Sequence, residues 1–259
     1  MSLIQIIEDR VAKYALIEKD MKIAALLTGR GNNTLRDKNV IPILGRPLCQ
    51  YPAMAAKRCE LITDFYVSSD DEKILSAAEE CGYKRIVRPA ELALPTAQHV
   101  DAIIHSLSVM KEDGCEPDIL VVLLANNATT KTEWIRESIN NLLGDPNLSA
   151  SCPVMREQDH HPYRCKCLRE DGCLGTWFDF GDKSISTNRQ DLPPNFVFCH
   201  NFWTLNLKKS LYSGKGQQPW TFMGENVKPV IVENSFDIHE IDDIIRTEKW
   251  LREEGIIDK

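Results

Sequence analysis

The chain has 259 residues, of which 43% are hydrophobic and 27% are charged, an ordinary composition for a globular protein. Its 31 Lys and Arg residues against 38 Asp and Glu residues give a formal charge of −7, which argues against a nucleic-acid-binding face. The longest apolar run, Ile119–Ala125, is far shorter than the roughly 18 residues that span a bilayer, so no membrane segment is expected.

The first twenty residues show a helical rather than a secretory pattern. Apolar residues recur at helical spacing between Ile4 and Ala15, so we expect an amphipathic helix over residues 3–19, docked on the body of the protein or on a partner subunit. Charged residues, among them Glu8 and Lys13, interrupt the apolar core that a signal peptide needs. Nine cysteines without an export signal favour a reducing, cytoplasmic location.

From residue 22 onward, short apolar runs alternate with helical patterns. Strands are expected at Ile23–Leu27, Phe65–Ser68, Lys84–Val87 and Ile119–Ala125. Helices are expected at Leu48–Arg58 with Pro47 at the first helical position, at a segment capped by Asp70 or Asp71 and ended by Gly82, at Ala97–Lys111 and at Thr132–Leu143. This alternation predicts an α/β fold, a mostly parallel, Rossmann-like sheet with helices on both faces. Such sheets bind ligands at the carboxyl ends of their strands.

The pattern changes near residue 150. After a strand at Ala150–Met155, residues 156–195 are polar and glycine-containing, and we expect a small β-rich arm there that pairs subunits. Returning strands are expected at Phe196–Leu205 and Val227–Val232, and a closing helix at Ile241–Glu254. The chain therefore divides into an N-terminal helical extension, residues 1–21, and a single domain, residues 22–259, that includes the arm.

The loop Thr28–Asn39 follows the first strand directly and combines glycines with basic residues. Glycines let backbone amides approach a phosphate, and Arg30, Arg36 and Lys38 supply positive charge in an otherwise acidic chain. The loop matches neither the P-loop nor the dinucleotide-binding fingerprint. Phosphate binding is the favoured interpretation, and a solvated turn is the alternative.

Six segments, in the right order and spanning residues 22–254, resemble the cytidylyltransferases that make CMP-activated acidic sugars. The resemblance is to acylneuraminate cytidylyltransferases (CMP-sialic acid synthetases) and, more distantly, to CMP-KDO synthetases. The matching segments are Gly29–Thr34 with Lys38-Asn39, Val67–Asp70, Arg88–Leu92, His160–Arg164, Arg189–Pro193 and Ser235–Ile238. Thr96 and Asn201 fall where the family has a nucleotide-side threonine and an asparagine on the sugar side.

The resemblance implies a nucleotidyltransferase sheet of the GT-A-like kind, a homodimer joined through the arm, and a reaction. The anomeric hydroxyl of an acidic sugar attacks the α-phosphate of CTP, and pyrophosphate leaves. Such a transfer depends on positioning and charge neutralisation. The resemblance assigns the triphosphate and catalysis to Arg30 and Lys38, and the nucleoside side to Asn39, Arg88 and Thr96.

For the acceptor side, the resemblance points to Asn127, Arg164, Arg189 and Asn201. A guanidinium can grip a sugar carboxylate in a bidentate pair, which suits the two arginines. Asp237 would hold Mg²⁺, a hard ion that prefers carboxylate and phosphate oxygens and retains water.

The chain departs from the family at two places. Leu124–Thr129 replaces the family's Leu-Gln-Pro-Thr-Ser-Pro, whose glutamine contacts the sugar, which leaves the substrate open. Asp237-Ile238-His239 replaces Asp-x-Asp, so one metal carboxylate is missing or is supplied from elsewhere, such as Glu240 or a substrate carboxylate. His239 is a further metal candidate, although Mg²⁺ disfavours nitrogen ligands.

Several alternatives stay open. The acceptor could be KDO or a phosphonate, or the protein could be a non-catalytic nucleotide- or sugar-binding relative. A metal-dependent glycosyltransferase would carry Asp-x-Asp after a central strand, and Ala125–Asn127 offers none. Asp237 could instead cap the last helix, and Arg88 could form an ion pair with Glu91.

Overall fold

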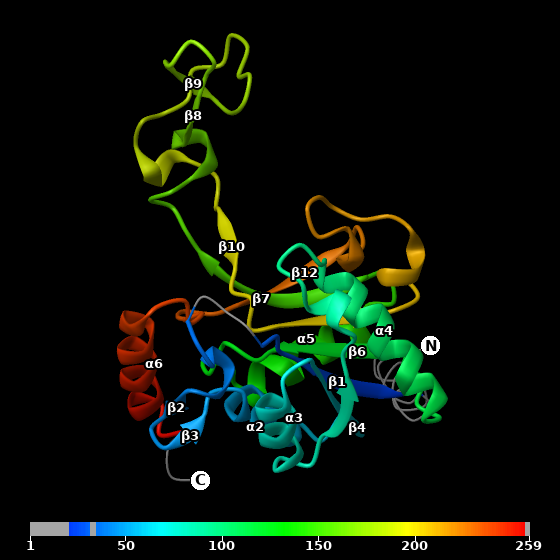
Figure 1. Ribbon diagram of the computed structural model, residues 1–259. Helices are drawn as coiled ribbons and strands as arrows, with labels where there is room; N and C mark the ends of the chain where they lie inside the picture. Colours follow the sequence, from blue (N-terminus) through cyan, green and yellow to red (C-terminus); the bar gives the residue numbers. More distant parts are fainter. Residues whose placement is uncertain (1–20, 32–34, 257–259) are drawn as a thin grey trace, which may run out of the picture.

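The computed structural model describes residues 21–31 and 35–256, and the helix expected over residues 3–19 lies outside them (Figure 1). Within the described residues, eight strands form one mixed sheet in the order β10-β7-β11-β6-β1-β4-β5, with β12 paired to β7. The strands are β1 (Ile23–Thr28), β4 (Asp64–Ser69), β5 (Lys84–Val87), β6 (Ile119–Leu124), β7 (Ala150–Arg156), β10 (Phe196–Phe198), β11 (Phe202–Asn206) and β12 (Val227–Ile231).

The central strands β1, β4, β5 and β6 are parallel, whereas β10 and β11 run antiparallel to their neighbours. The helices are α2 (Gln50–Lys57), α3 (Glu72–Glu79), α4 (His99–Glu112), α5 (Thr132–Gly144) and α6 (Ile241–Glu253). Two short hairpins stand apart from the sheet, β2 (Pro42–Ile43) with β3 (Arg46–Pro47) and β8 (Lys166–Leu168) with β9 (Leu174–Thr176).

Alternate residues of β1 supply the cores on opposite faces of the sheet, as the pleat of a strand requires. Ile23, Ala25 and Leu27 pack with α2, α3 and α5, whereas Ala24 and Leu26 pack with α4. All six residues of β1 are buried, which explains the unbroken apolar run Ile23–Leu27 in this strand. The predicted α/β fold, with a mostly parallel sheet and helices on both faces, is confirmed (Figure 1).

Two predicted elements are wrong in detail. Pro47 lies in strand β3 and not at the start of a helix, because the chain first turns through the β2–β3 hairpin before α2 begins at Gln50. The expected strand Phe196–Leu205 is two strands separated by residues 199–201. Along β7, Val154 lies opposite Phe198 and Ser151 lies opposite Thr204. The segment Phe198–Thr204 is therefore longer than the segment of β7 that it faces, and its extra residues bulge out of the sheet.

The arm, residues 156–195, projects from the sheet edge and ends in the β8–β9 hairpin (Figure 1). Large apolar side chains are exposed on it, with Leu168 at 75% and Trp177 at 64% exposure. Tyr163 contacts the rings of Phe178 and Phe180 edge-on, at centroid distances of 5.7 and 5.2 Å. The arm is therefore held by a small aromatic cluster of its own and leaves apolar surface uncovered.

The nine cysteines are all unpaired thiols. Burial raises the pKa of Cys49, Cys152 and Cys199 to about 12, whereas Cys165 and Cys173 are exposed on the arm. Over residues 21–31 and 35–256, no helix combines the length and apolar character needed to cross a membrane.

Candidate functional site

The carboxyl ends of β1, β4 and β6 meet at one edge of the sheet. Thr28 lies opposite Ser68 of β4 on one side and opposite Leu124 of β6 on the other. The chain leaves β1 for β4 and β5 in one direction and returns to β6 on the other side, which opens a crevice at the point where the strand order reverses. A cavity of about 230 Å³ lies there, bounded by the loop after β1, the segment after β5, the start of α4 and Asn126.

Two glycines let the loop after β1 lie close to its neighbours. A Cβ atom on Gly29 would lie 3.0 Å from the Cβ of Ala125, and one on Gly31 would lie 3.1 Å from the Cβ of Asp71. The backbone N–H of Gly31 donates to Oδ1 of Asp70 at 2.9 Å. The loop therefore rests directly on the turn that follows β4.

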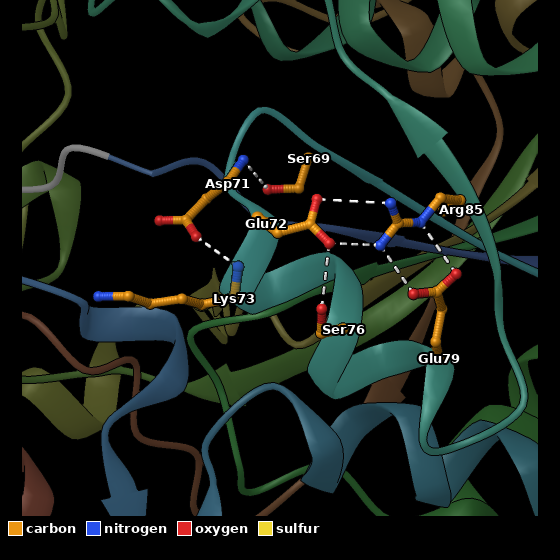
Figure 2. Close-up of polar contacts among 7 residues, drawn as sticks. All are labelled: Ser69, Asp71, Glu72, Lys73, Ser76, Glu79 and Arg85. Atoms are coloured by element: carbon orange, nitrogen blue, oxygen red, sulfur yellow. Dashed lines mark hydrogen bonds and ion pairs between the residues drawn. The ribbon is translucent and has the colours of Figure 1, made fainter.

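That turn is fixed to the start of α3 (Figure 2). The N–H of Asp71 donates to Oγ of Ser69, and Oδ1 of Asp71 accepts from the N–H of Lys73 at 2.8 Å, which caps the helix. Further along α3, Arg85 of β5 bridges Glu72 and Glu79 at 2.6 and 2.8 Å. The turn beneath the loop is thus held by the helix cap.

Arg88 is the most buried cation of the cavity wall, with only 7% of its surface exposed. Its Nη2 donates to the Ser68 carbonyl at 2.8 Å and its Nε to the Ser68 hydroxyl at 3.2 Å. Burial lowers the pKa of Arg88, and the nearby Asp70 opposes that effect. The alternative that Arg88 serves as an ion-pair partner of Glu91 is wrong, because the described residues show no such pair and two of the Arg88 nitrogens donate to Ser68 instead.

Arg30 and Lys38 line the same cavity. Nη1 of Arg30 donates to the carbonyl of Leu94 at 3.0 Å, which brings the loop after β1 against the segment before α4. Burial lowers the pKa of Lys38, and the Asp237 carboxylate opposes that effect. The structure therefore brings Arg30, Lys38 and Arg88 together around one cavity.

The two other residues predicted for the nucleoside side differ in placement. Asn39 lines the cavity and is only 4% exposed, and its side-chain amide donates to the Arg30 carbonyl at 2.8 Å. Asn39 therefore fixes the shape of the loop. Thr96 is exposed in the loop before α4, between the wall residues Leu94 and Ala97, and is not itself part of the wall.

Asp237 lies near Lys38, and one of its carboxylate oxygens has no hydrogen-bond partner among the described residues. Oδ2 lies 3.1 Å from Nε2 of His239, while Oδ1 is buried without a hydrogen bond. Burial raises the pKa of Asp237 to about 6, although His239 and Lys38 act in the opposite direction. The N–H of Ile238 donates to the carbonyl of Asn126 at 3.1 Å, which ties this segment to the loop after β6.

Asp237 does not cap the last helix. Glu240 is the capping residue of α6, and Asp243 completes a reciprocal capping box by accepting from the Glu240 N–H. The alternative reading of Asp237 as a helix cap is therefore wrong, and its carboxylate is left for another use.

The buried, unpartnered Oδ1 of Asp237 fits the metal that the resemblance implies, because Mg²⁺ is commonly held by one or two carboxylates together with substrate phosphates and water. Among the described residues, no group of three His, Cys, Asp or Glu side chains could form a complete metal cage. His239 contacts Oδ2 through its ring nitrogen, so it lies where it can orient the carboxylate.

The structure does not bring Asn127 and Asn201 to the cavity. Both are fully buried, and the side-chain amide of Asn201 donates to Oδ1 of Asn127 at 3.0 Å. Asn127 also donates to Oγ of Ser235 at 3.0 Å. This placement runs against direct contact with a substrate, because the loop after β6 turns Asn127 inward and leaves Asn126 in the cavity wall.

Arg164 and Arg189 lie on the arm, and neither is part of the cavity wall. The arm projects away from the sheet (Figure 1). Arg189 forms an ion pair with Asp159, and Nη1 of Arg164 donates to the Asp159 carbonyl at 3.1 Å. The two guanidinium groups thus share one neighbour. A single chain does not bring them to Arg30, Lys38 and Asp237.

Sequence reasoning missed His99 and Asn126, both of which line the cavity. His99 is the first residue of α4, and its Nε2 lies 2.9 Å from Oγ1 of Thr28 at the end of β1. The positive end of a helix disfavours the protonated form of a histidine. The position of His99 near the start of the helix expected at Ala97–Lys111 was therefore a signal that the sequence offered. There was no comparable signal in the sequence for Asn126, because either Asn126 or Asn127 could have faced the cavity.

Comparison with known proteins identifies the family of this chain. The profile of the family described as Cytidylyltransferase matches residues 30–165. Among curated proteins, the chain is 35% identical over 89 residues to the N-acylneuraminate cytidylyltransferase of Escherichia coli O18:K1:H7, covering 34% of this chain and 21% of that protein. It is 28% identical over 144 residues to the 3-deoxy-manno-octulosonate cytidylyltransferase of Desulfosudis oleivorans, covering 54% and 55%.

A third relative is the 8-amino-3,8-dideoxy-manno-octulosonate cytidylyltransferase of Shewanella piezotolerans, 34% identical over 84 residues, 32% of this chain and 34% of that protein. The chain thus spans between about a fifth and just over half the length of these relatives. The fold is similar to that of CMP:2-keto-3-deoxy-manno-octonic acid synthetase complexed with CTP, with a TM-score of 0.65 and 15% identity over 90% of this chain and 99% of that one.

Proposed function

Because the chain belongs to the cytidylyltransferase family, we propose that it transfers CMP from CTP to the anomeric hydroxyl of an acidic sugar and releases pyrophosphate. The observation that carries this proposal is the convergence of Arg30, Lys38 and Arg88 on one cavity, with the unpartnered oxygen of Asp237 nearby. Arg30 and Lys38 suit the triphosphate, Arg88 suits the nucleoside side, and a bare carboxylate suits the metal that accompanies the nucleotide.

Each group has a part in the transfer. The bond between the anomeric oxygen and the α-phosphorus forms as the bond from the α-phosphorus to the oxygen of pyrophosphate breaks, and the hydroxyl proton leaves to solvent. Arg30 and Lys38 neutralise the charge that develops on the departing phosphates, and Arg88 holds the nucleoside side. Mg²⁺ held by Asp237 would supply further charge neutralisation and would make the attacking hydroxyl more acidic.

The acceptor is proposed to be a nonulosonate such as a sialic, legionaminic or pseudaminic acid. The likeness to the E. coli N-acylneuraminate enzyme supports this choice. A 3-deoxy-octulosonate or its 8-amino analogue is the second candidate, supported by the likeness to the Desulfosudis and Shewanella enzymes, and both kinds of acid carry the carboxylate that an arginine can grip. A phosphonate acceptor and a non-catalytic role are the remaining alternatives.

Arg164 and Arg189 are proposed to bind the sugar carboxylate from the arm. Because they lie on a projecting segment with exposed apolar side chains, we propose a homodimer in which the arm meets the partner subunit. Arg189→Ala should then raise the KM for the acid about tenfold or more and leave the KM for CTP nearly unchanged. Equal effects on the two values would remove Arg189 from the acceptor site.

The first experiment is pyrophosphate release with Mg²⁺, CTP and a panel of acids: sialic, legionaminic, pseudaminic, KDO, 8-amino-KDO and an aminoalkylphosphonate. Release with CTP and one acid, and none with ATP, GTP or UTP, is the expected result. Silence across the panel despite CTP binding by calorimetry would favour the non-catalytic alternative. No binding of CTP at all would contradict the proposed role of the loop after β1.

Asp237→Asn tests the metal side. It should retain CTP binding in the absence of metal and lose at least about 100-fold in the rate of pyrophosphate release. Asp242→Asn is the matched control, since Asp242 is an exposed carboxylate in the first turn of α6. Turnover that survives in Asp237→Asn would show that the metal is held elsewhere.

A further inference from the structure

His99 lines the cavity from the first turn of α4. It forms part of the same wall as Arg88, with Leu92, Leu94 and Ala102 as apolar neighbours along that wall. No motif match pointed to it. An imidazole among apolar side chains can form hydrogen bonds with a ligand only through its two ring nitrogens. Whether each nitrogen carries a proton therefore decides whether it binds a donor or an acceptor of the ligand.

The hydrogen bond to Thr28 fixes the tautomer. Oγ1 of Thr28 has a single proton, and that proton is donated to the carbonyl of Leu123 at 3.1 Å. The 2.9 Å contact between Oγ1 and Nε2 of His99 must therefore be one in which His99 donates. Nε2 carries the proton, and Nδ1 of the neutral ring is a bare acceptor.

The surroundings keep the ring neutral. Burial lowers the pKa of His99 to about 4, and the charge of Arg88 adds to that effect. The positive end of the α4 dipole acts in the same direction. Nδ1 of His99 has no hydrogen-bond partner within the described residues. It is also not one of the fully buried polar atoms that lack a partner, so it is not closed off from solvent.

Arg88 presents the opposite polarity in the same wall. Its Nε and Nη2 donate to Ser68, which leaves Nη1 as a donor without a partner among the described residues. A donor from Arg88 beside an acceptor from His99 complements the edge of cytosine, whose O2 and N3 accept and whose 4-amino group donates. Uracil presents an acceptor oxygen at position 4, which would face the lone pair of Nδ1.

We propose that His99 selects CTP over UTP by accepting, at Nδ1, a hydrogen bond from the 4-amino group of cytosine. This inference rests on the proposed use of CTP. His99 is thus a specificity residue, because a buried acceptor rejects a ligand that brings another acceptor to it as well as favouring one that brings a donor.

The test compares CTP, UTP and the pyrimidin-2-one ribonucleoside triphosphate, which lacks only the 4-amino group. Calorimetry without metal should show the wild-type protein binding CTP roughly 10- to 100-fold more tightly than the analogue. His99→Phe, which keeps the ring volume and loses both nitrogens, should lower CTP affinity to that of the analogue and leave the analogue unaffected. His99→Gln, whose amide oxygen can accept, should restore part of the ratio.

His105→Phe is the matched control, because His105 lies on the same helix outside the cavity wall, and it should keep the wild-type ratio. Equal loss of CTP and analogue affinity in His99→Phe would overturn the inference and leave the proposed function standing. A wild-type protein that binds no CTP would overturn both.

A readout on the wild-type protein does not depend on folding of the variants. The Nδ1 resonance of ¹⁵N-labelled His99 should shift with CTP and not with the analogue. The same shift with both ligands would mean that the ring only packs against the base.

Discussion

The Asn201 side-chain amide donates a hydrogen bond to Oδ1 of Asn127, and neither side chain is exposed. The same Oδ1 accepts from the hydroxyl of Thr129 at 2.7 Å, and Oγ of Ser235 donates to Oδ1 of Asn201 at 2.9 Å. The bulge before β11, the loop after β6 and the segment leading to Asp237 are therefore joined by one buried polar network. Such a network specifies a geometry only when all of its members are satisfied.

Asn201→Ala should destabilise the protein by about 2–3 kcal/mol, because it leaves Asn127 and Ser235 buried with lost partners. Urea denaturation followed by circular dichroism measures the change. Asn126→Ala, which removes a half-buried amide from the cavity wall, should cost much less. Equal losses in the two variants would mean that the network contributes little to stability.

His99 should make the protein sensitive to mild acid. Its pKa is about 4 in the folded chain against an ordinary value of 6.5, so the unfolded chain binds the extra proton between these values. Above pH 6.5 the ring of His99 is neutral in the folded and the unfolded chain, so it does not reduce the free energy of unfolding. As the pH falls from 6.5 toward 4, protonation of the unfolded chain lowers that free energy by up to about 3 kcal/mol. The difference in unfolding free energy between wild type and His99→Phe should change over this range. A difference that stays constant between pH 6.5 and pH 4 would contradict the prediction.

The arm should hold the dimer through its apolar side chains. Leu168 and Leu174 lie opposite each other in the β8–β9 hairpin and are 75% and 70% exposed. Replacing both by Asp should give monomers in light scattering at micromolar concentration, because two charges would be buried in an apolar contact. Tyr212→Asp, at a side chain 65% exposed outside the arm, is the control. A wild-type protein that is already monomeric would contradict the prediction.

The cap of α3 should contribute measurably to stability. Asp71→Ala removes the acceptor for the Lys73 N–H and should cost about 1 kcal/mol, seen as a lower midpoint of thermal unfolding. Asp71→Asn keeps an acceptor oxygen and should lose much less. If both variants melt like the wild type, the turn that supports Gly31 is held by other contacts.

Much of the site could be predicted because parallel strands end at one edge. Arg30 and Arg88 each follow a strand of the same sheet, so their approach followed from the pattern of strands alone. Which side chain of the loop after β6 faces the cavity could not be predicted in this way. Whether Asn126 or Asn127 faces the cavity depends on Asn201 and Ser235, which lie 74 and 108 positions from Asn127 in the sequence.

The split of the returning strand has a similar origin. The run Phe196–Leu205 has the composition of one strand, and the bulge arises only when the run is laid along β7 and β6. His200 adopts a φ of 46° at the bulge, a left-handed backbone conformation that a histidine in the sequence does not predict. Pairing between distant strands therefore decides the local backbone.

The uneven distribution of the thiols gives the protein a built-in attachment point for dyes. Cys165 and Cys173 are exposed on the arm, whereas Cys49, Cys152 and Cys199 are shielded and hold their protons. A maleimide fluorophore should therefore couple first to the arm of the unaltered protein. Energy transfer between differently labelled chains would then report, without engineered cysteines, how far apart two arms lie and whether substrate brings them closer.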